Sequence, residues 1–262
     1  MDLGIQGRVA MVAAASKGLG KASAIALAQA GCKLAICARH PEALEATAAE
    51  LRALGADVLA LPVDVTQAEA IARWVAATQA RFGTIDIAVT NTGGPPAAPF
   101  AALTDEQWQS GVDSTLMNVV RLCRLVLPGM QERGWGRIVH ITSFVAKEPV
   151  ALLTVSSTLR AGLSALTKTL ATQVGPDGVT VNAVLPGHTL TDRQRHLAEI
   201  PMAEQGITEE AYYAGVAKEV PLRRLAAAQE VGDVVAFLAS ERAGYVTGQS
   251  LTVDGGLSKG TF

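Results

Sequence analysis

Short apolar runs alternate along this chain with longer amphipathic stretches, and this alternation restricts the possible folds more than any other feature. The apolar runs have the length of strands and little polar alternation, which indicates strands that are covered on both faces. The stretches between them have helical periodicity over ten or more residues, which is the pattern of βαβ units. The sequence therefore predicts an α/β fold with one doubly wound, parallel, seven-stranded sheet and helices on both faces.

The boundaries of the elements follow from the same pattern. The predicted strands are residues 8–14, 33–38, 58–61, 85–89, 137–141, 179–184 and 250–253. Helical periodicity covers residues 19–30, 41–54, 115–132 and 154–174. Capping boxes at Thr66-Gln67-Ala68-Glu69 and Thr104-Asp105-Glu106-Gln107 predict the first turns of two further helices.

The segment 188–224 is polar and charged and interrupts the alternation. Ligands of doubly wound sheets bind at the carboxyl ends of the strands. We therefore expect one domain, residues 1–262, in which 188–224 forms a mobile flap that covers the substrate at that edge.

Composition excludes several classes of protein. The 262 residues carry 22 basic and 24 acidic side chains, so charge gives no case for binding nucleic acid or anionic membranes. Mean hydropathy is high, at +0.28, yet no apolar run of about 18 residues lacks a charge or a turn residue. Cys32, Cys37 and Cys123 have no metal-ligand spacing and are predicted to be buried thiols in a reducing compartment. Residues 1–6 lack the pattern of a signal peptide, so a cytoplasmic protein is expected.

A glycine loop follows the first predicted strand. The stretch Ala13-Ala14-Ala15-Ser16-Lys17-Gly18-Leu19-Gly20 stands between that strand and a helix. Glycines at such a turn let a diphosphate approach the backbone N–H groups and the helix N-terminus. The predicted contacts of this loop with a dinucleotide are Ala14, Ser16, Lys17, Gly18, Leu19 and Gly20.

The residues near the second strand bear on the choice of dinucleotide. That strand ends in Ala38-Arg39, without the acid that binds a ribose 2′-hydroxyl in NAD sites. Lys17 and Arg39 are cations, which suit a 2′-phosphate. The sequence therefore favours NADP(H) over NAD(H).

Taken in order, these motifs resemble the short-chain dehydrogenase/reductases, a Rossmann-type family, over essentially the whole chain. The segments that carry the resemblance are Gly18 and Gly20, Asp64-Val65, Asn91-Thr92-Gly93-Gly94, Asn118, Ser143, Pro186-Gly187 with Thr191, Val246-Thr247-Gly248-Gln249 and Val253-Asp254-Gly255-Gly256. The resemblance implies cofactor contacts at Asp64, Val65, Asn91, Gly93, Pro186, Gly187, Thr189 and Thr191. It also implies active-site roles for Asn118 and Ser143, a small-molecule substrate and a homotetramer.

The chain departs from the family's pattern at two places. Ala13-Ala14 replaces the Thr-Gly that opens the family's loop, and alanine disfavours a positive φ. Ser156 and Arg160 stand where the family has its catalytic Tyr and Lys. In the family, the Lys lowers the pKa of that Tyr, near 10 in water, so that it donates a proton to the reduced carbonyl. Serine is a much weaker acid, and arginine stays protonated, although it can bind ribose hydroxyls or an anion.

Other side chains are therefore candidates for the proton donor. Lys147, in the loop after Ser143, qualifies if it is partly desolvated, and His188 qualifies beside the expected nicotinamide. Tyr212 and Tyr213 in the flap could move into the site, or pack as part of an amphipathic helix. Ser143 and Ser156 could hold a water, and Arg193 and Arg195 could bind a substrate carboxylate or lie at the surface as solvated charges.

Three functions remain open at this point. The first is an NADP(H)-dependent oxidoreductase that acts on a small carbonyl, hydroxyl or enone substrate with a non-standard proton donor. The second is an NADP(H)-binding protein with little or no turnover, such as a sensor or partner subunit. The third is non-redox chemistry, because dehalogenase-like relatives also carry Arg at the family's Lys position. Those relatives keep the Tyr and lose the glycine loop, whereas this chain does the opposite.

Overall fold

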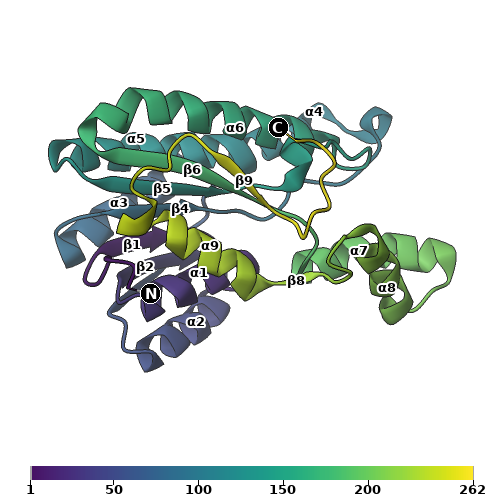
Figure 1. The fold of residues 1–262 in the computed structure, drawn as a ribbon, viewed down its shortest axis with the longest axis horizontal. Coiled ribbons are helices and arrows are strands. Elements are labelled where there is room, and N and C mark those ends of the chain that lie inside the picture. Colours follow the sequence, from purple (N-terminus) through teal and green to yellow (C-terminus); the bar gives the residue numbers. More distant parts are fainter. Residues whose placement is uncertain (1, 262) are drawn as a thin grey trace.

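A seven-stranded parallel sheet forms the centre of the protein in the computed structural model, which describes residues 2–261 (Figure 1). The strand order is β3-β2-β1-β4-β5-β6-β9, and every neighbouring pair is parallel. The strands are β1 Val9–Val12, β2 Lys33–Ala38, β3 Val58–Pro62, β4 Ile87–Thr90, β5 Gly136–Ile141, β6 Val179–Pro186 and β9 Ser250–Val253. The chain reverses its direction of progress between β1 and β4, which is where ligands bind in such sheets. The predicted fold class is confirmed.

Helices cover both faces of the sheet. One face carries α1 Gly18–Gln29, α2 Pro41–Ala53 and α9 Ala228–Leu238. The other carries α3 Ala68–Phe82, α5 Asn118–Glu132 and α6 Thr154–Val174. Small residues let α1 and α9 approach closely, because a Cβ at Gly232 would lie 2.6 Å from the carbonyl oxygen of Ala22. The three cysteines are buried between these layers, and burial raises the pKa of each thiol to about 12.

Two predicted helix starts have different outcomes. The capping box at Thr104 is confirmed, since its hydroxyl accepts from the backbone N–H of Gln107 at the start of α4 (Asp105–Gly111). The capping box at Thr66 was wrong. Asp64 accepts hydrogen bonds from both the backbone N–H and the hydroxyl of Thr66, at 2.9 and 2.8 Å. This local turn engages the side chain, and the helix begins at Ala68 instead.

The predicted helix 115–132 has an irregular beginning. Residues Val112–Met117 form a turn of π-helix, and the regular α5 starts at Asn118. Such π-turns are frequent at functional sites. The change of winding here sets the position of the Asn118 side chain, which is buried against the sheet.

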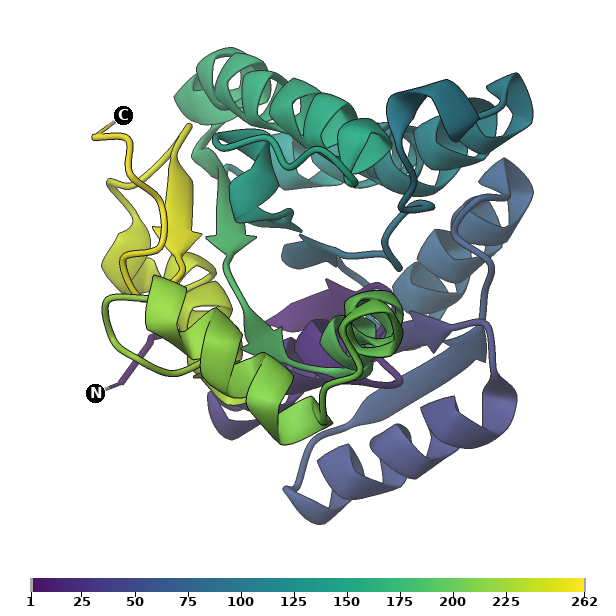
Figure 2. The same ribbon diagram turned by 90° about the vertical axis from the view of Figure 1, so that its right-hand side faces the viewer.

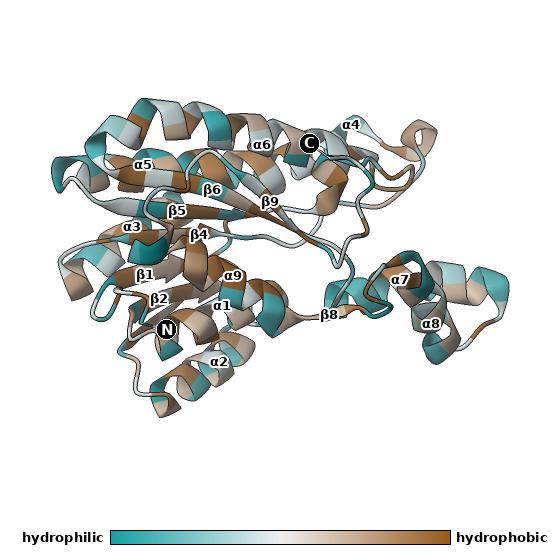
Figure 3. Ribbon diagram, viewed as in Figure 1, coloured by the Kyte–Doolittle hydropathy of each residue, from teal (hydrophilic) through white to brown (hydrophobic). Residues whose placement is uncertain are grey.

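The segment predicted as a flap contains two helices that project from the body of the molecule (Figure 1). Strand β7 (Thr189–Leu190) leads into α7 Asp192–Gln205 and α8 Glu209–Glu219, and β8 (Ala226–Ala227) pairs with β7 as the chain returns. The view along the molecule places these helices in front of the central sheet (Figure 2). Coloured by hydropathy, the strands are largely brown, whereas α7 and α8 mix both colours (Figure 3). None of the described residues of α8 is buried.

Two searches of residues 2–261 give negative results. No helix is long and apolar enough to cross a membrane. No group of three or more His, Cys, Asp or Glu side chains is arranged to hold a metal ion.

Candidate active site

The glycine loop keeps a left-handed backbone although alanine replaces its first glycine. Ala14 has φ +49° and Gly18 has φ +56°. The carbonyl oxygen of Ala14 packs directly over the Cα of Gly20, too close for any side chain there. Asn91, from the loop after β4, donates from Nδ2 to the same carbonyl at 3.4 Å. The loop conformation that the Ala13-Ala14 substitution put in doubt is therefore formed.

The N-terminus of α1 has the properties of an anion site. Lys17 occupies the N-cap position without a side-chain cap, and the first turn contains no acidic residue. Its backbone N–H groups point toward the loop with the positive end of the helix dipole. Gly93, across the loop, has no neighbour within 4 Å of where a Cβ would lie. These residues fit the diphosphate and ribose of a dinucleotide.

The two cations predicted to select NADP(H) differ in their surroundings. The Nζ atom of Lys17 is 3.0 Å from a carboxylate oxygen of Asp192 on α7, so its charge is already matched. Arg39 is exposed directly after β2 and forms no ion pair within residues 2–261. Arg39 is thus the one that can bind a 2′-phosphate without breaking an existing pair.

The other predicted cofactor contacts lie at the carboxyl edge of the sheet. Asp64 and Val65 follow β3, Pro186 ends β6, and Thr191 caps α7 by accepting from the backbone N–H of Gln194. A Cβ at Gly18 would lie 3.6 Å from the Thr191 side chain, so the flap begins directly over the glycine loop. The remaining ones, Ser16, Leu19, Gly187 and Thr189, belong to the same loops.

Ser156 and Arg160 form a hydrogen-bonded pair on α6. Arg160 donates from Nε to the Ser156 hydroxyl at 3.1 Å and from Nη1 to the carbonyl of Ile141, the last residue of β5, at 3.4 Å. Ser143 lies two residues after Ile141, and its hydroxyl accepts a hydrogen bond from the backbone N–H of Val145 at 3.4 Å. The strand end of β5 therefore positions both the Ser143 hydroxyl and the Arg160 guanidinium.

Arg160 carries a buried charge. Only 7% of the residue is exposed, and burial, with a further contribution from the charge of Arg193, lowers its pKa to about 10. The guanidinium is still a cation at neutral pH, because the value remains well above 7. No carboxylate within residues 2–261 forms an ion pair with it.

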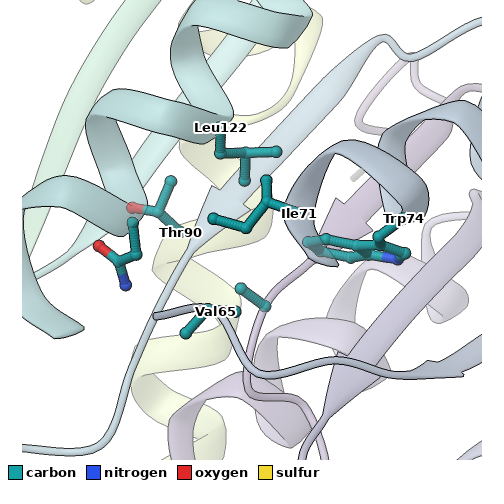
Figure 4. A pocket seen from close by; sticks show the side chains of 7 residues that line it. Val65, Ile71, Trp74, Thr90 and Leu122 are labelled. Carbon is teal, nitrogen blue, oxygen red and sulfur yellow. The ribbon is translucent and has the colours of Figure 1, made fainter. Parts of the chain in front are cut away.

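Val65, Ile71, Trp74 and Leu122 line a small apolar cavity of about 10 Å³ (Figure 4). Asn118 also borders this cavity. Its Oδ1 atom is buried and has no hydrogen-bond partner in the described part of the chain. This volume is about the smallest that can hold a water molecule. Asn118 therefore has a free acceptor beside this cavity.

The structure separates the candidate proton donors. The ring of His188 packs against Phe144, with centroids 5.7 Å apart, and Phe144 is the neighbour of Ser143. Lys147 is exposed, so the desolvation that its proposed role required is absent. Tyr212 and Tyr213 pack against each other on α8, and burial raises the pKa of both, which makes them weaker acids. Of the two remaining kinds of candidate, the histidine and the flap tyrosines, His188 is the one with a contact to the Ser143 loop.

The two flap arginines also have different environments. Arg195 is a solvated surface charge, paired with Asp192 at 3.4 Å and Glu209 at 3.3 Å. Arg193 points inward and donates from Nη2 to the carbonyl of Pro95 at 3.0 Å. The surface interpretation is wrong for Arg193, and the sequence signal that could have found it is Gly94, whose missing side chain makes room for the guanidinium.

Comparison with known proteins gives matches over nearly the full length of the chain. Residues 13–258 match the family model described as enoyl-(acyl carrier protein) reductase. The 3-oxoacyl-[acyl-carrier-protein] reductase of Pseudomonas aeruginosa is 35% identical over 255 residues, which is 97% of this chain and 99% of that protein. The structure of L-sorbose reductase from Gluconobacter frateurii with NADPH and L-sorbose superposes with a TM-score of 0.95 at 35% identity, covering 99% of this chain and 100% of the other. A variant of actinorhodin polyketide ketoreductase with NADPH gives a TM-score of 0.93 at 35% identity, covering 97% and 98%.

Proposed function

The chain belongs to the short-chain dehydrogenase/reductase family, and from that premise we propose that it is an NADP(H)-dependent oxidoreductase with a non-standard proton donor. It would transfer a hydride between nicotinamide and a small carbonyl, hydroxyl or enone substrate. The observation that carries the proposal is the intact left-handed glycine loop beside the Ser143, Ser156 and Arg160 cluster. The structures of L-sorbose reductase and the polyketide ketoreductase, both with NADPH, support the choice of cofactor, as does the free Arg39.

Three side chains, Ser143, Arg160 and His188, have separate roles in this reaction. NADPH, when bound, supplies the hydride. The Ser143 hydroxyl donates a hydrogen bond to the substrate oxygen and polarises the carbonyl. Arg160 holds the ribose or the substrate through the guanidinium N–H groups that Ser156 and Ile141 leave free. His188 supplies the proton, because its imidazole can donate one and its ring packs against Phe144, the neighbour of Ser143.

A test of this function begins with fluorescence titrations of the protein with NADPH and NADH. We expect micromolar binding of NADPH and much weaker binding of NADH. NADPH oxidation is then followed with a panel of ketones, aldehydes and enones. In Ser143→Ala, kcat falls about 100-fold or more, while NADPH binding is unchanged. Ser164→Ala on α6 is the control, because its hydroxyl only bonds to a carbonyl of its own helix. Turnover that Ser143→Ala leaves untouched removes Ser143 from the mechanism.

A second candidate function rests on the same two positions. Neither the Ser156 hydroxyl nor the Arg160 guanidinium can donate a proton as the family's Tyr and Lys do. An NADP(H)-binding protein without turnover would bind NADPH tightly and gain reductase activity in the double variant Ser156→Tyr/Arg160→Lys. Appreciable turnover by the natural chain rules this alternative out.

Two further properties are part of the proposal. The flap 188–224 covers the bound substrate, which is supported by the contacts of Thr191 and Asp192 with the glycine loop. We also propose that the protein assembles as a homotetramer, as its resemblance to the family implies. Light scattering on the purified protein measures the second property directly.

A further inference from the structure

Two arginines from different elements converge on the carboxyl edge of the sheet. Arg160 comes from α6, in the body of the protein, and Arg193 comes from α7, in the flap. The Arg160 guanidinium donates to the last residue of β5, and the Arg193 guanidinium donates to the loop that follows the neighbouring β4, so both lie at the carboxyl ends of adjacent strands. Burial lowers the pKa of both groups.

Arg193 is held in a site that fits its guanidinium. Its Nη2 atom donates to the carbonyl of Pro95 at 3.0 Å. A Cβ at Gly94 would lie 2.7 Å from the same Nη2 and 2.8 Å from Cζ and Nε, so a side chain at that position would displace the guanidinium from this place. Gly94 and Pro95 follow β4, next to the point where the strand order reverses. The guanidinium therefore lies against the loop that follows β4 and is only partly exposed.

The charges of these two arginines are not matched by the protein. Within residues 2–261, neither guanidinium has a carboxylate within 4.0 Å. Asp192, the acid next to Arg193, is engaged by Lys17 and Arg195. Two like charges removed from water without a counter-ion are costly, and an anion between them relieves both costs.

Acids elsewhere on the same edge are also engaged. Glu148 accepts hydrogen bonds from the backbone N–H groups of Lys259 and Gly260. Asp254 accepts from Gly256 and Ser258, at 2.9 and 2.7 Å. Backbone N–H groups hold both carboxylates in place, and neither forms an ion pair with Arg160 or Arg193.

We propose that Arg160 and Arg193 bind the carboxylate of the substrate, and that the protein acts on oxo acids or unsaturated oxo acids. This inference rests on the proposed function. A carboxylate matches the planar, two-pronged donor geometry of arginine. The diphosphate of the cofactor already has the N-terminus of α1, whereas Arg160 stands at the end of β5 with Ser143, where the reacting carbonyl is placed.

The reaction balances with the carboxylate as a bystander. The oxo acid, NADPH and one proton give the hydroxy acid and NADP⁺. A C–H bond forms at the carbonyl carbon, which is reduced, while the nicotinamide is oxidised. The proton is added to the carbonyl oxygen, and the carboxylate keeps its charge throughout. Its role is to fix the distance between the arginines and the carbon that is reduced.

The test compares acids with matched neutral compounds. The substrates are 2-oxobutanoate, 3-oxobutanoate and 4-oxopentanoate, each beside its methyl ester, with NADPH oxidation as the readout. For at least one acid we expect kcat/KM to exceed that of its ester by about tenfold or more. In Arg193→Gln, kcat/KM for that acid falls about 10- to 100-fold, mainly through KM, because a hydrogen-bonded charge pair is lost. The values for the ester and the Kd for NADPH change by less than about threefold.

Arg195→Gln is the matched control. It removes the same charge from the same helix, two residues away, but its guanidinium already has carboxylate partners at the surface. We expect this variant to behave as the natural protein toward acids and esters alike.

Two outcomes would overturn the inference. Esters that react as well as acids show that no carboxylate is recognised. Weaker NADPH binding in Arg193→Gln, with an unchanged preference for acids, shows that the cofactor's phosphates occupy the site instead.

A readout without turnover separates this inference from the proposed function. In the presence of NADPH, the preferred acid should raise the unfolding temperature of the natural protein and of Arg195→Gln, and not that of Arg193→Gln. If this pattern appears without any NADPH oxidation, the anion site stands and the oxidoreductase proposal fails. If NADPH is oxidised with neutral carbonyls and no acid shifts the unfolding temperature, the oxidoreductase proposal stands and the anion site fails.

Discussion

Arg137 and Arg160 are buried to nearly the same degree, 4% and 7% exposed, at opposite edges of the sheet. Arg137 lies near the start of β5 and donates to the carbonyls of Gly136, Gly178 and Ser240. It also lies 3.6 Å from a carboxylate oxygen of Glu241 and over the ring of Trp135. Arg160 meets the end of the same strand and has only the Ser156 hydroxyl and the Ile141 carbonyl.

The different partners of Arg137 and Arg160 indicate that the two ends of the strands have different roles. At the amino edge, the protein supplies partners for a buried charge, so the charge contributes to stability. At the carboxyl edge, no carboxylate among the described residues pairs with the Arg160 guanidinium. This charge can therefore bind a ligand, and its burial lowers the stability of the fold. Residues that bind or react commonly show such a trade.

Arg160→Met is expected to have the largest effect, and the effect is on catalysis. Removing a preorganised cation from the site should lower kcat/KM about 100- to 1000-fold, which is about 3–4 kcal/mol. Steady-state NADPH oxidation with the best substrate measures it. Arg160→Lys restores part of the activity if charge alone is needed, and none if the two-pronged geometry is needed.

Arg137→Met should affect folding and leave catalysis intact. The variant removes the donor of three carbonyls and the ion pair with Glu241, which keeps its bonds from Trp135 and Arg8, so we expect the free energy of unfolding to fall by about 3 kcal/mol. Urea denaturation measures this loss, and kcat/KM per folded molecule should change by less than about twofold. Arg81→Met is the control, because an exposed pair with Asp57 contributes about 1 kcal/mol or less.

The buried His140 of β5 should make the stability of the fold depend on pH. Its Nδ1 atom is 2.9 Å from the Thr90 hydroxyl, and burial lowers its pKa to about 4. The unfolded chain takes up a proton as pH falls below about 6.5, whereas the folded chain does not until about 4. Stability is therefore complete above pH 6.5 and is lost as pH falls from 6.5 to 4, by about 2 kcal/mol at pH 5.

Urea denaturation at several pH values checks this loss in the natural protein and in His140→Gln. The part of the pH dependence that comes from His140 should disappear in the variant. His196→Gln should keep it, because that side chain is 70% exposed. An unchanged slope in His140→Gln would contradict the assignment.

Ala14→Gly should have the smallest effect. Ala14 has a positive φ, which costs an L-residue about 1 kcal/mol relative to glycine. We expect the variant to be more stable by about that amount and to bind NADPH at least as tightly. Arg223→Gly relieves the same strain outside the loop, at φ +57°, so it should gain stability without a change in NADPH binding.

The sequence predicted most of the fold because its elements depend on local periodicity. The limits of β2, α6 and β9 agree with their predicted ranges, and the other predicted strands and helices differ by a few residues. Helices α7, α8 and α9 had no predicted range. The capping box at Thr66 does not form, because Asp64 engages Thr66 in a turn, and α3 begins one residue later than the box predicts. That competition depends on side-chain geometry rather than on composition.

The site could be predicted only in part. The motif residues lie at the carboxyl edge because parallel strands end there together. Whether a cation is free or matched depends on contacts between distant segments, such as Lys17 with Asp192 or Arg193 with Pro95. Sequence spacing does not show such contacts, so Arg193 and Arg195 could not be distinguished before the structure.

The most direct test of the contrast between the edges is the unfolding of Arg160→Met without any ligand. We predict that its free energy of unfolding stays within about 1 kcal/mol of the natural protein or rises, because an unmatched buried charge is removed. A loss of about 3 kcal/mol, as expected for Arg137→Met, would show that Arg160 is a structural residue and would contradict the account.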